Sequence, residues 1–131
     1  MKLIDGKGIV LGRLASFVAK ESLKGEEINI LNCDFVIITG NKKTTEKEFE
    51  VKRSRFGHSQ KGPKHPATSE KIVKRAIRGM LPNYREGRGS IAFKKIKCYS
   101  KIPKEFEGKK VYELKINKKI KSSEVKEFIK K

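Results

Sequence analysis

The pattern of apolar and polar residues over the first 40 positions predicts a strand, a helix and two further strands. Residues 2–5 fit a short buried strand. Residues 11–24 repeat apolar side chains at helical spacing and end at Gly25, where a C-cap glycine is expected. The runs 28–31 and 35–38 are almost continuously apolar. That pattern is typical of strands covered on both faces, as in a parallel sheet flanked by helices.

The strongest helical pattern lies between residues 68 and 81. Thr68 is the expected N-cap, and Pro82 ends the pattern. The residues expected on its apolar face are Ile72, Val73, Ala76, Ile77, Met80 and Leu81. This segment is predicted to be an amphipathic helix.

The remaining segments have weaker patterns. Residues 42–52 are polar with modest helix potential and one main apolar anchor, Phe49. Residues 83–90 are expected to form a polar loop, and residues 91–99 fit either a short helix or a strand. Residues 111–116 alternate as an edge strand would.

Near the C-terminal end, Ser122 or Ser123 is expected to cap a last helix whose apolar face contains Val125, Phe128 and Ile129. The whole order is then strand, helix, strand, strand, helix, strand, helix, which favours a three-layer α/β domain. No linker is evident, so residues 1–131 are expected to form one domain that carries a basic loop at about 52–66.

The charge of the chain restricts its partners. Its 33 Lys and Arg against 15 Asp and Glu leave a formal net charge of +18. A densely anionic partner would relieve the self-repulsion of such a chain and would attract it over long distances. Nucleic acid is favoured over an anionic membrane surface, and an ordinary metabolic enzyme rarely needs this charge.

The cysteines and the apolar runs indicate a compartment. Cys33 and Cys98 show no CxxC spacing and each lies in an apolar run, which predicts buried, reduced thiols. No run has the length of a signal peptide or reaches the roughly 18 apolar residues of a membrane span. We therefore expect a soluble, cytoplasmic protein.

Residues 6–12 form a GxGxxxG pattern between a predicted strand and a predicted helix, a setting in which a dinucleotide pyrophosphate can bind. The acid available for the ribose, Asp34, falls in a turn after Asn32. A second mononucleotide-binding half is also missing. A tight turn with close helix packing is the favoured interpretation, and a small nucleotide-dependent enzyme is the alternative function.

The two histidines do not indicate catalysis. His58 and His65 lie among Lys, Arg and Pro, and nearby cations disfavour both imidazolium formation and metal binding. Neither a third ligand nor a paired carboxylate is close in the sequence, and no nucleophile–base pair is singled out. No enzyme activity, metal or cofactor is therefore predicted.

The strongest functional signal lies between Val51 and Arg85. These residues include ten Lys or Arg and a single acid, Glu70. Four of the cations, at positions 71, 74, 75 and 78, share one stripe of the predicted helix. A merely solvated face would normally interleave acids at i±4, so this stripe is expected to contact phosphates. The segment 53–66 before it, with Phe56 as a stacking ring, is expected to order against a nucleic-acid backbone.

Three sequence blocks resemble the ribosomal protein L thirteen family of the large subunit, in its archaeal and eukaryotic form. They are Ile4-Asp5-Gly6 followed by LGRLAS at 11–16, RGMLP at 78–82, and GRGSIAFKKIKCY at 87–99 followed by Ile102-Pro103. Their order and spacing fit from end to end. The tyrosine- and glycine-rich loop of bacterial members is replaced by FGHSQKGPKHPA, so the loop contacts of bacterial relatives do not transfer.

The resemblance implies a small, mostly parallel four-stranded sheet flanked by helices, and a non-catalytic protein of the large ribosomal subunit in the cytoplasm. Its expected partners are large-subunit ribosomal RNA and neighbouring ribosomal proteins, and its expected role includes early subunit assembly. A DNA-binding chromatin protein would share the charge argument. The residues expected to contact RNA are Arg13, Arg53, Arg55, His58, Lys61, Lys64, Lys71, Lys74, Arg75, Arg78, Arg85 and Arg88.

Overall fold

A four-stranded sheet organises the computed structural model, which describes residues 1–55, 62–114 and 121–129. The order across the sheet is β4-β2-β1-β5, and all three pairings are parallel. The strands are β1 (Lys2–Asp5), β2 (Ile28–Leu31), β4 (Ile96–Cys98) and β5 (Tyr112–Glu113). The predicted mostly parallel four-stranded sheet is confirmed.

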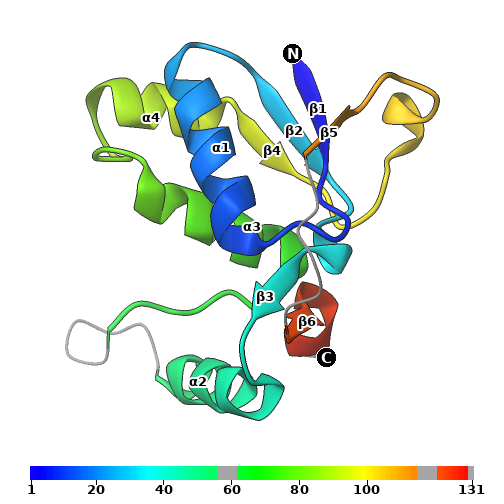
Figure 1. Cartoon of the computed structure of the whole chain (residues 1–131). Coiled ribbons are helices and arrows are strands. Elements are labelled where there is room, and N and C mark those ends of the chain that lie inside the picture. The colour runs from blue at the N-terminus through cyan, green and yellow to red at the C-terminus, as the bar shows by residue number, and fades with distance from the viewer. Residues whose placement is uncertain (56–61, 115–120, 130–131) are drawn as a thin grey trace.

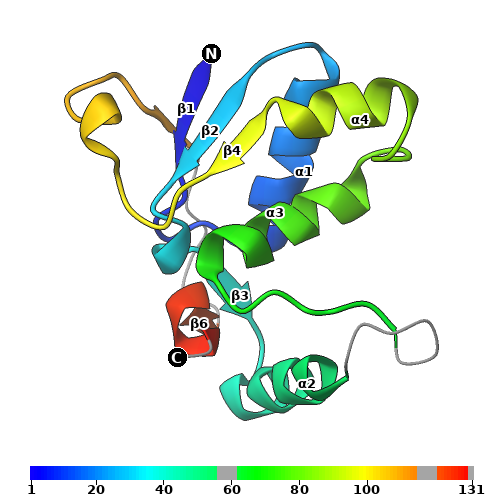
Figure 2. The ribbon, with the colours of Figure 1, turned by 180° about the vertical axis from the view of Figure 1, so that it is seen from behind.

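Three helices, α1 (Leu11–Leu23), α3 (Ser69–Met80) and α4 (Gly87–Lys94), lie on one side of this sheet (Figures 1 and 2). The parallel register places Ile4 beside Ile30 and Ile28 beside Ile96. All four side chains are fully buried in the core that the helices cover. Alternation along the strands therefore directs one row of isoleucines toward the helices.

The opposite face of the sheet is covered without a long helix. Leu3 and Leu31 are directed to that side and pack against Phe106, which belongs to a 3-10 turn at Lys104–Phe106. Every residue of β2 is buried, including the polar Asn29, as its almost continuously apolar sequence predicted. The three layers are the helices, the sheet and the segment around Phe106.

Helix α3 confirms the strongest sequence pattern, with one exception. Ile72, Val73 and Ile77 are buried. Met80 is 45% exposed, so its assignment to the apolar face is wrong. The chain leaves the helix one residue later, and the buried position at this end is taken by Leu81, which has extended backbone.

A second, two-stranded sheet pairs β3 (Ile37–Thr39) with β6 (Ser122–Glu124) in antiparallel register. The run 35–38 was expected in the parallel sheet, and that expectation is wrong. A 3-10 turn at Cys33–Phe35 follows Asn32, whose φ of 56° lies in the left-handed region. This turn directs the chain away from the end of β2.

The predicted last helix is also wrong. Ser122 and Ser123 lie in β6, and the described residues after it form a 3-10 turn at Val125–Phe128 and no α-helix. The Val125 N–H donates to the Val36 carbonyl at 2.8 Å. Because a three-residue spacing also fits a 3-10 turn, Val125 and Phe128 are buried without an α-helix.

Helix α2 (Lys42–Ser54) lies apart from the sheet, at the bottom of Figure 1. The side chain of Asn41 caps it by accepting from the Lys43 N–H. No residue of α2 is buried. Its principal apolar contact is Phe49, whose ring stacks on Phe128 with 5.3 Å between centroids. The predicted helix is confirmed, and it extends two residues past Lys52.

The segment 83–99 contains both of the structures that its sequence allowed. Helix α4 begins at Gly87, so the predicted loop at 83–90 is wrong for residues 87–90, and β4 follows the helix after Lys95. Glycine at position 89 allows α4 to lie close to the backbone of Pro82, because a Cβ at this position would lie 2.2 Å from the Pro82 carbonyl oxygen. Of the predicted strand 111–116, β5 is present as an edge strand, and residues 115 and 116 lie outside the described residues.

Candidate nucleic-acid interface

The glycine-containing turn at residues 6–12 is packed against protein. A Cβ on Gly6 would lie 2.7 Å from Val36 Cγ2, and Gly8 has a φ of 72° that favours glycine. The Asp5 carboxylate accepts from the Lys7 N–H and from the Asn32 amide, at 3.0 and 2.9 Å. These contacts confirm a tight turn. The predicted close helix packing is wrong, because Gly6 packs against Val36 and a Cβ on Gly12, in α1, would meet no atom within 4 Å.

The acid considered for a ribose has a different role here. Asp34 lies in the 3-10 turn after β2, and its carboxylate accepts a hydrogen bond from the Ser69 hydroxyl. Ser69 is the first residue of α3 and is buried. Asp34 therefore fixes the start of α3. Thr68 occupies the predicted N-cap position, but its side chain makes no capping hydrogen bond.

The four predicted cations of α3 lie on the side away from its buried residues. Lys71 is exposed, and Lys74, Arg75 and Arg78 are half-buried. Glu70, in the first turn, is the one acid of this helix. Since Ile72, Val73 and Ile77 anchor the helix in the core, the backbone beneath the cations is held in place. The stripe is part of a fixed surface.

A groove of about 540 Å³ runs along this stripe. One wall is α3, and the other is the segment 64–68, which returns alongside the helix. None of the described residues that line the groove is acidic. Its lining residues are Lys64, His65, Pro66, Ala67, Thr68, Lys71, Lys74, Arg75, Arg78 and Phe93. Five predicted RNA contacts are therefore brought together.

Two arginines hold the segment 64–68 in place. Arg53, in the last turn of α2, donates from Nε and Nη2 to the Pro66 carbonyl, both at 3.3 Å. Its guanidinium also lies 5.0 Å from the centre of the Phe49 ring. Arg75 donates to the Lys64 carbonyl at 3.5 Å. Arg53 thus supports one wall of the groove and does not line it.

Aromatic rings, which sequence reasoning missed, lie beneath the cations. Lys74 Nζ is 4.9 Å from the centre of the Phe93 ring. Arg78 and Arg85 lie 4.7 and 5.5 Å from the ring of Tyr84, which meets Phe93 edge-on at 6.0 Å. Tyr84 lies in the loop after α3 and Phe93 lies on α4, so the connection between these helices brings both rings to the stripe. The sequence signal was limited to two aromatic residues in a basic region.

His65 lines the groove as a neutral side chain. Burial lowers its pKa from the usual 6.5, and the charges of Arg75 and Lys52 lower the pKa further. No group of three or more metal-binding side chains occurs among the described residues. His58 and Lys61 lie outside the described residues.

The other predicted contacts are distributed around the molecule. Arg13 is exposed in the first turn of α1, and Arg55 is exposed directly after α2. Arg88 is exposed in the first turn of α4. Arg85 adjoins the groove through Tyr84, and its Nε donates to the Tyr84 hydroxyl at 3.1 Å. Arg13, Arg55 and Arg88 do not line the groove.

The two cysteines are free thiols. Cys33 is buried as predicted, whereas Cys98 is only half-buried. A hydrogen bond with Cys98, together with burial, raises the pKa of the Cys33 thiol. Among the described residues, no helix is long and apolar enough to span a bilayer.

Comparison with known proteins adds a family to this geometry. The sequence profile of a family described as "Ribosomal protein L13" matches residues 1–105, a range that includes α3 and the groove. The large ribosomal subunit protein uL13 of Methanosphaera stadtmanae is 44% identical over 115 residues, which cover 86% of this chain and 80% of the relative. The protein of the same name from Methanosarcina barkeri is 46% identical over 106 residues, covering 80% and 74%. That from Methanocaldococcus jannaschii is 45% identical over 107 residues, covering 79% and 77%.

Proposed function

Because the chain belongs to the ribosomal protein L13 family, we propose that it binds ribosomal RNA of the large subunit along the groove beside α3. The family consists of structural components of the large ribosomal subunit, so the chain is a ribosomal constituent and not an enzyme. The alternative of a nucleotide-dependent enzyme is therefore set aside. RNA binding, early assembly and contacts with neighbouring ribosomal proteins are the proposed parts of its role.

One observation carries the proposal: five cations line a groove in which no described lining residue is acidic. The attraction of Lys and Arg to phosphates releases counterions from RNA, and each neutralised phosphate adds to the affinity. Arg75 and Arg78 present planar guanidinium groups that suit paired phosphate oxygens, and the lysines act as point charges. Such contacts set the position of the protein on RNA and read little sequence.

The fixed backbone of α3 makes these contacts efficient. A charged side chain on a flexible segment must lose chain entropy when it binds, whereas α3 is already ordered by Ile72, Val73 and Ile77. The +18 charge also favours early binding to RNA, since the RNA phosphates relieve the self-repulsion of the free protein. An early place in subunit assembly agrees with this charge.

Replacement of three cations of the stripe tests the proposal. The triple variant Lys74→Gln, Arg75→Gln and Arg78→Gln keeps good helix formers and leaves the buried face unchanged. The variant relieves repulsion among the cations but also loses the Arg75 donation to the Lys64 carbonyl, so we expect its free energy of unfolding to change by no more than about 1 kcal/mol. Its affinity for large-subunit RNA fragments should fall, and its log–log salt slope should become shallower by up to about three units.

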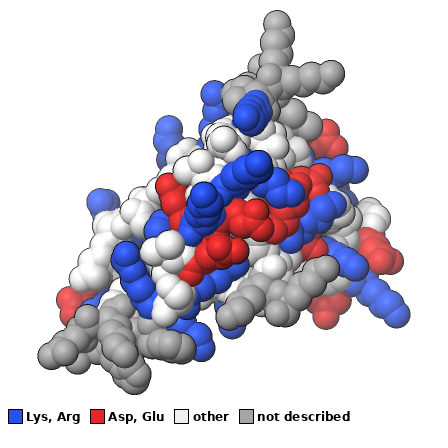
Figure 3. Space-filling view, turned by 90° about the horizontal axis from the view of Figure 1, so that it is seen from below, with Lys and Arg blue, Asp and Glu red and all other residues white. Residues whose placement is uncertain are grey.

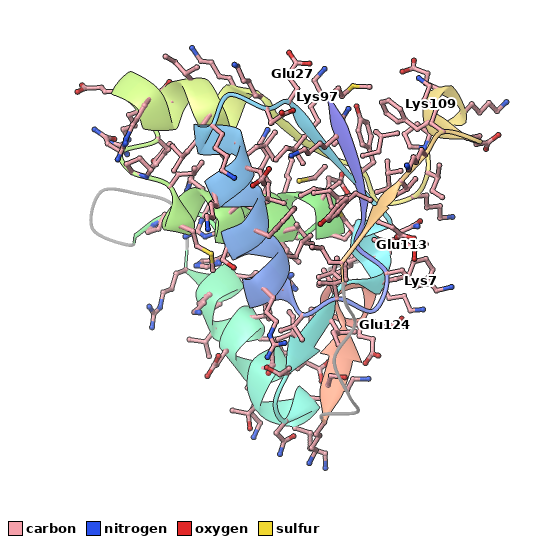
Figure 4. The ribbon with its side chains drawn as sticks, turned by 45° about the horizontal axis from the view of Figure 1, so that its top comes forward. Lys7, Glu27, Lys97, Lys109, Glu113 and Glu124 are labelled. Atoms are coloured by element: carbon pink, nitrogen blue, oxygen red, sulfur yellow. The ribbon has the colours of Figure 1, made fainter. Side chains whose placement is uncertain are left out.

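A matched control removes the same charge elsewhere. Lys97 and Lys109 lie on the side that carries β4 and the segment before β5 (Figure 4). Together with Lys104 they are exposed cations that do not line the groove. Their triple replacement by Gln should retain most of the affinity. Equal losses in the two triple variants, or large subunits that incorporate the α3 variant as well as the parent, would contradict the proposal.

The nucleic-acid class is tested by the same assay. Structured large-subunit RNA should bind more tightly than duplex DNA of equal length at one salt concentration. A preference for DNA would favour the chromatin-protein alternative.

A further inference from the structure

The groove contains more apolar surface than a set of phosphate contacts needs. Pro66, Ala67 and the Phe93 ring line it, and its cations extend from both walls. Its volume of about 540 Å³ lies within the range of about 300–1,000 Å³ that is typical of sites for small organic groups. A chain of phosphates alone would leave this apolar floor unused.

The backbone of an RNA duplex does not fit such a floor, because its bases are stacked inside the helix and its phosphates lie on the convex outside. An unpaired nucleotide presents both a flat base and a phosphate. Aromatic side chains are the usual partners of such bases in RNA-binding proteins, and every base has a face that can stack. The combination of ring and cations in the groove corresponds to the two parts of one nucleotide.

We propose that the groove binds a single unpaired nucleotide of the RNA, with the base against Phe93 and the adjoining phosphate at Arg75 and Arg78. This inference rests on the proposed function and identifies the structure that the RNA must present. Lys74, whose Nζ lies 4.9 Å from the centre of the Phe93 ring, moves aside on binding. A lysine–ring contact is generally weaker than the stacking of a base, and the displaced ammonium remains near the phosphate.

Two hairpins of the same stem sequence test the inference on the full chain. One carries a single bulged 2-aminopurine, a fluorescent adenine analogue, and the other is fully paired. The bulged hairpin should bind about tenfold more tightly, within the range expected for one base–aromatic stack. Its fluorescence should fall on binding, because stacking quenches the analogue. Adenosine monophosphate at equal concentration should not displace it, because it lacks the flanking phosphates.

Two variants change the groove in opposite ways. Phe93→Leu removes the flat ring and keeps an apolar side chain, and Ala67→Leu fills the space between the walls. Each should abolish the tenfold preference and leave the affinity for the paired hairpin within about twofold. The control is Tyr112→Leu, which removes a ring that is 53% exposed and stacked on Phe17, far from α3 in sequence and on β5. It should keep the preference.

The outcomes separate this inference from the proposed function. If the parent binds both hairpins equally, with a steep salt dependence, the groove does not select an unpaired nucleotide, yet RNA binding by the stripe stands. If adenosine monophosphate displaces the bulged hairpin at equal concentration, the groove is a site for free nucleotides and the inference is overturned. Should Phe93→Leu fail to fold, the Ala67→Leu variant decides, and its retention of the preference would also overturn the inference. Failure of both hairpins to bind would contradict both proposals.

Discussion

Helices α2 and α3 are similar in length and in net charge, and they differ in how their charges are arranged. Helix α2 has 13 residues with five basic and three acidic side chains, and α3 has 12 residues with four basic and one acidic. In α2 the acids Glu46, Glu48 and Glu50 alternate with the cations. Figure 3, a view from the end of the molecule that carries α2, shows acidic and basic side chains intermingled.

The two helices also differ in how they are held. No residue of α2 is buried, whereas α3 buries Ile72, Val73 and Ile77 in the main core. Because their net charges are similar, net charge alone would have identified both helices as RNA-binding surfaces. The separation of acids from cations, and the attachment of the helix to the core, distinguish α3. A basic helix is a strong interface candidate when both conditions are met.

The largest expected difference between the helices is in stability. Ile77→Ala removes a fully buried side chain of α3 and should lower the free energy of unfolding by about 2–5 kcal/mol. Val51→Ala removes methyl groups from an α2 side chain that is 51% exposed and should change it by no more than about 0.5 kcal/mol. Urea unfolding of both variants measures the difference. Similar losses would mean that α2 is anchored as firmly as α3.

The next difference concerns RNA. Replacing Lys43, Lys47 and Lys52 of α2 with Gln removes as much charge as the α3 triple variant does. The salt slope of RNA binding should become shallower by less than about one unit, against up to about three for α3, because these lysines have acidic neighbours. Filter binding at several salt concentrations measures both slopes. Equal slopes would show that net charge alone controls binding.

Arg53 connects the two helices and sharpens the comparison. Arg53→Lys keeps the charge and loses the paired donation to the Pro66 carbonyl. If Arg53 acts by holding the wall of the groove, affinity for RNA should fall about threefold to tenfold, the effect of losing about 1 kcal/mol of charge-assisted hydrogen bonding. The measurement is a binding titration at one salt concentration. An unchanged affinity would indicate that only the charge of Arg53 matters.

The smallest effect should come from His65. Burial and nearby cations lower its pKa below 6.5 in the folded protein, so the unfolded chain binds more protons as the pH falls through about 6.5. Protonation of His65 should therefore reduce the stability of the free protein. A phosphate bound in the groove should favour the protonated imidazole. We expect RNA affinity to rise by less than about tenfold between about pH 7.5 and 5.5. His65→Gln should lose this rise, and a parent whose affinity is independent of pH would contradict the prediction.

Sequence patterns predicted the elements whose contacts are local or face a continuous core. The helix at 69–80 was found because its buried residues repeat within 12 positions, and β2 because three of its four residues are apolar, with Asn29 as the exception. The strand β3 and the turn after β6 were misassigned because they are stabilised by each other. A long-range antiparallel pairing leaves almost no local signal in three-residue strands.

The site was predicted in the same uneven way. The spacing of Lys71, Lys74, Arg75 and Arg78 identified the stripe from the sequence alone, since helical geometry is local. The groove was not foreseen, because it requires the segment 64–68 and the ring of Phe93 to lie against α3. The supporting role of Arg53 was likewise hidden, since the charge of this residue does not reveal that its guanidinium donates to the Pro66 carbonyl.

The strand order affects how the chain folds during its synthesis. Strand β1 is synthesised first but lies inside the sheet, where one of its neighbours is β5, at Tyr112–Glu113. One edge of β1 therefore stays open during most of translation, and parallel pairings between distant segments close slowly. Open strand edges invite aggregation. The cationic region 51–85 emerges before β4 and β5 do, so mutual repulsion keeps nascent copies apart while the sheet is still incomplete.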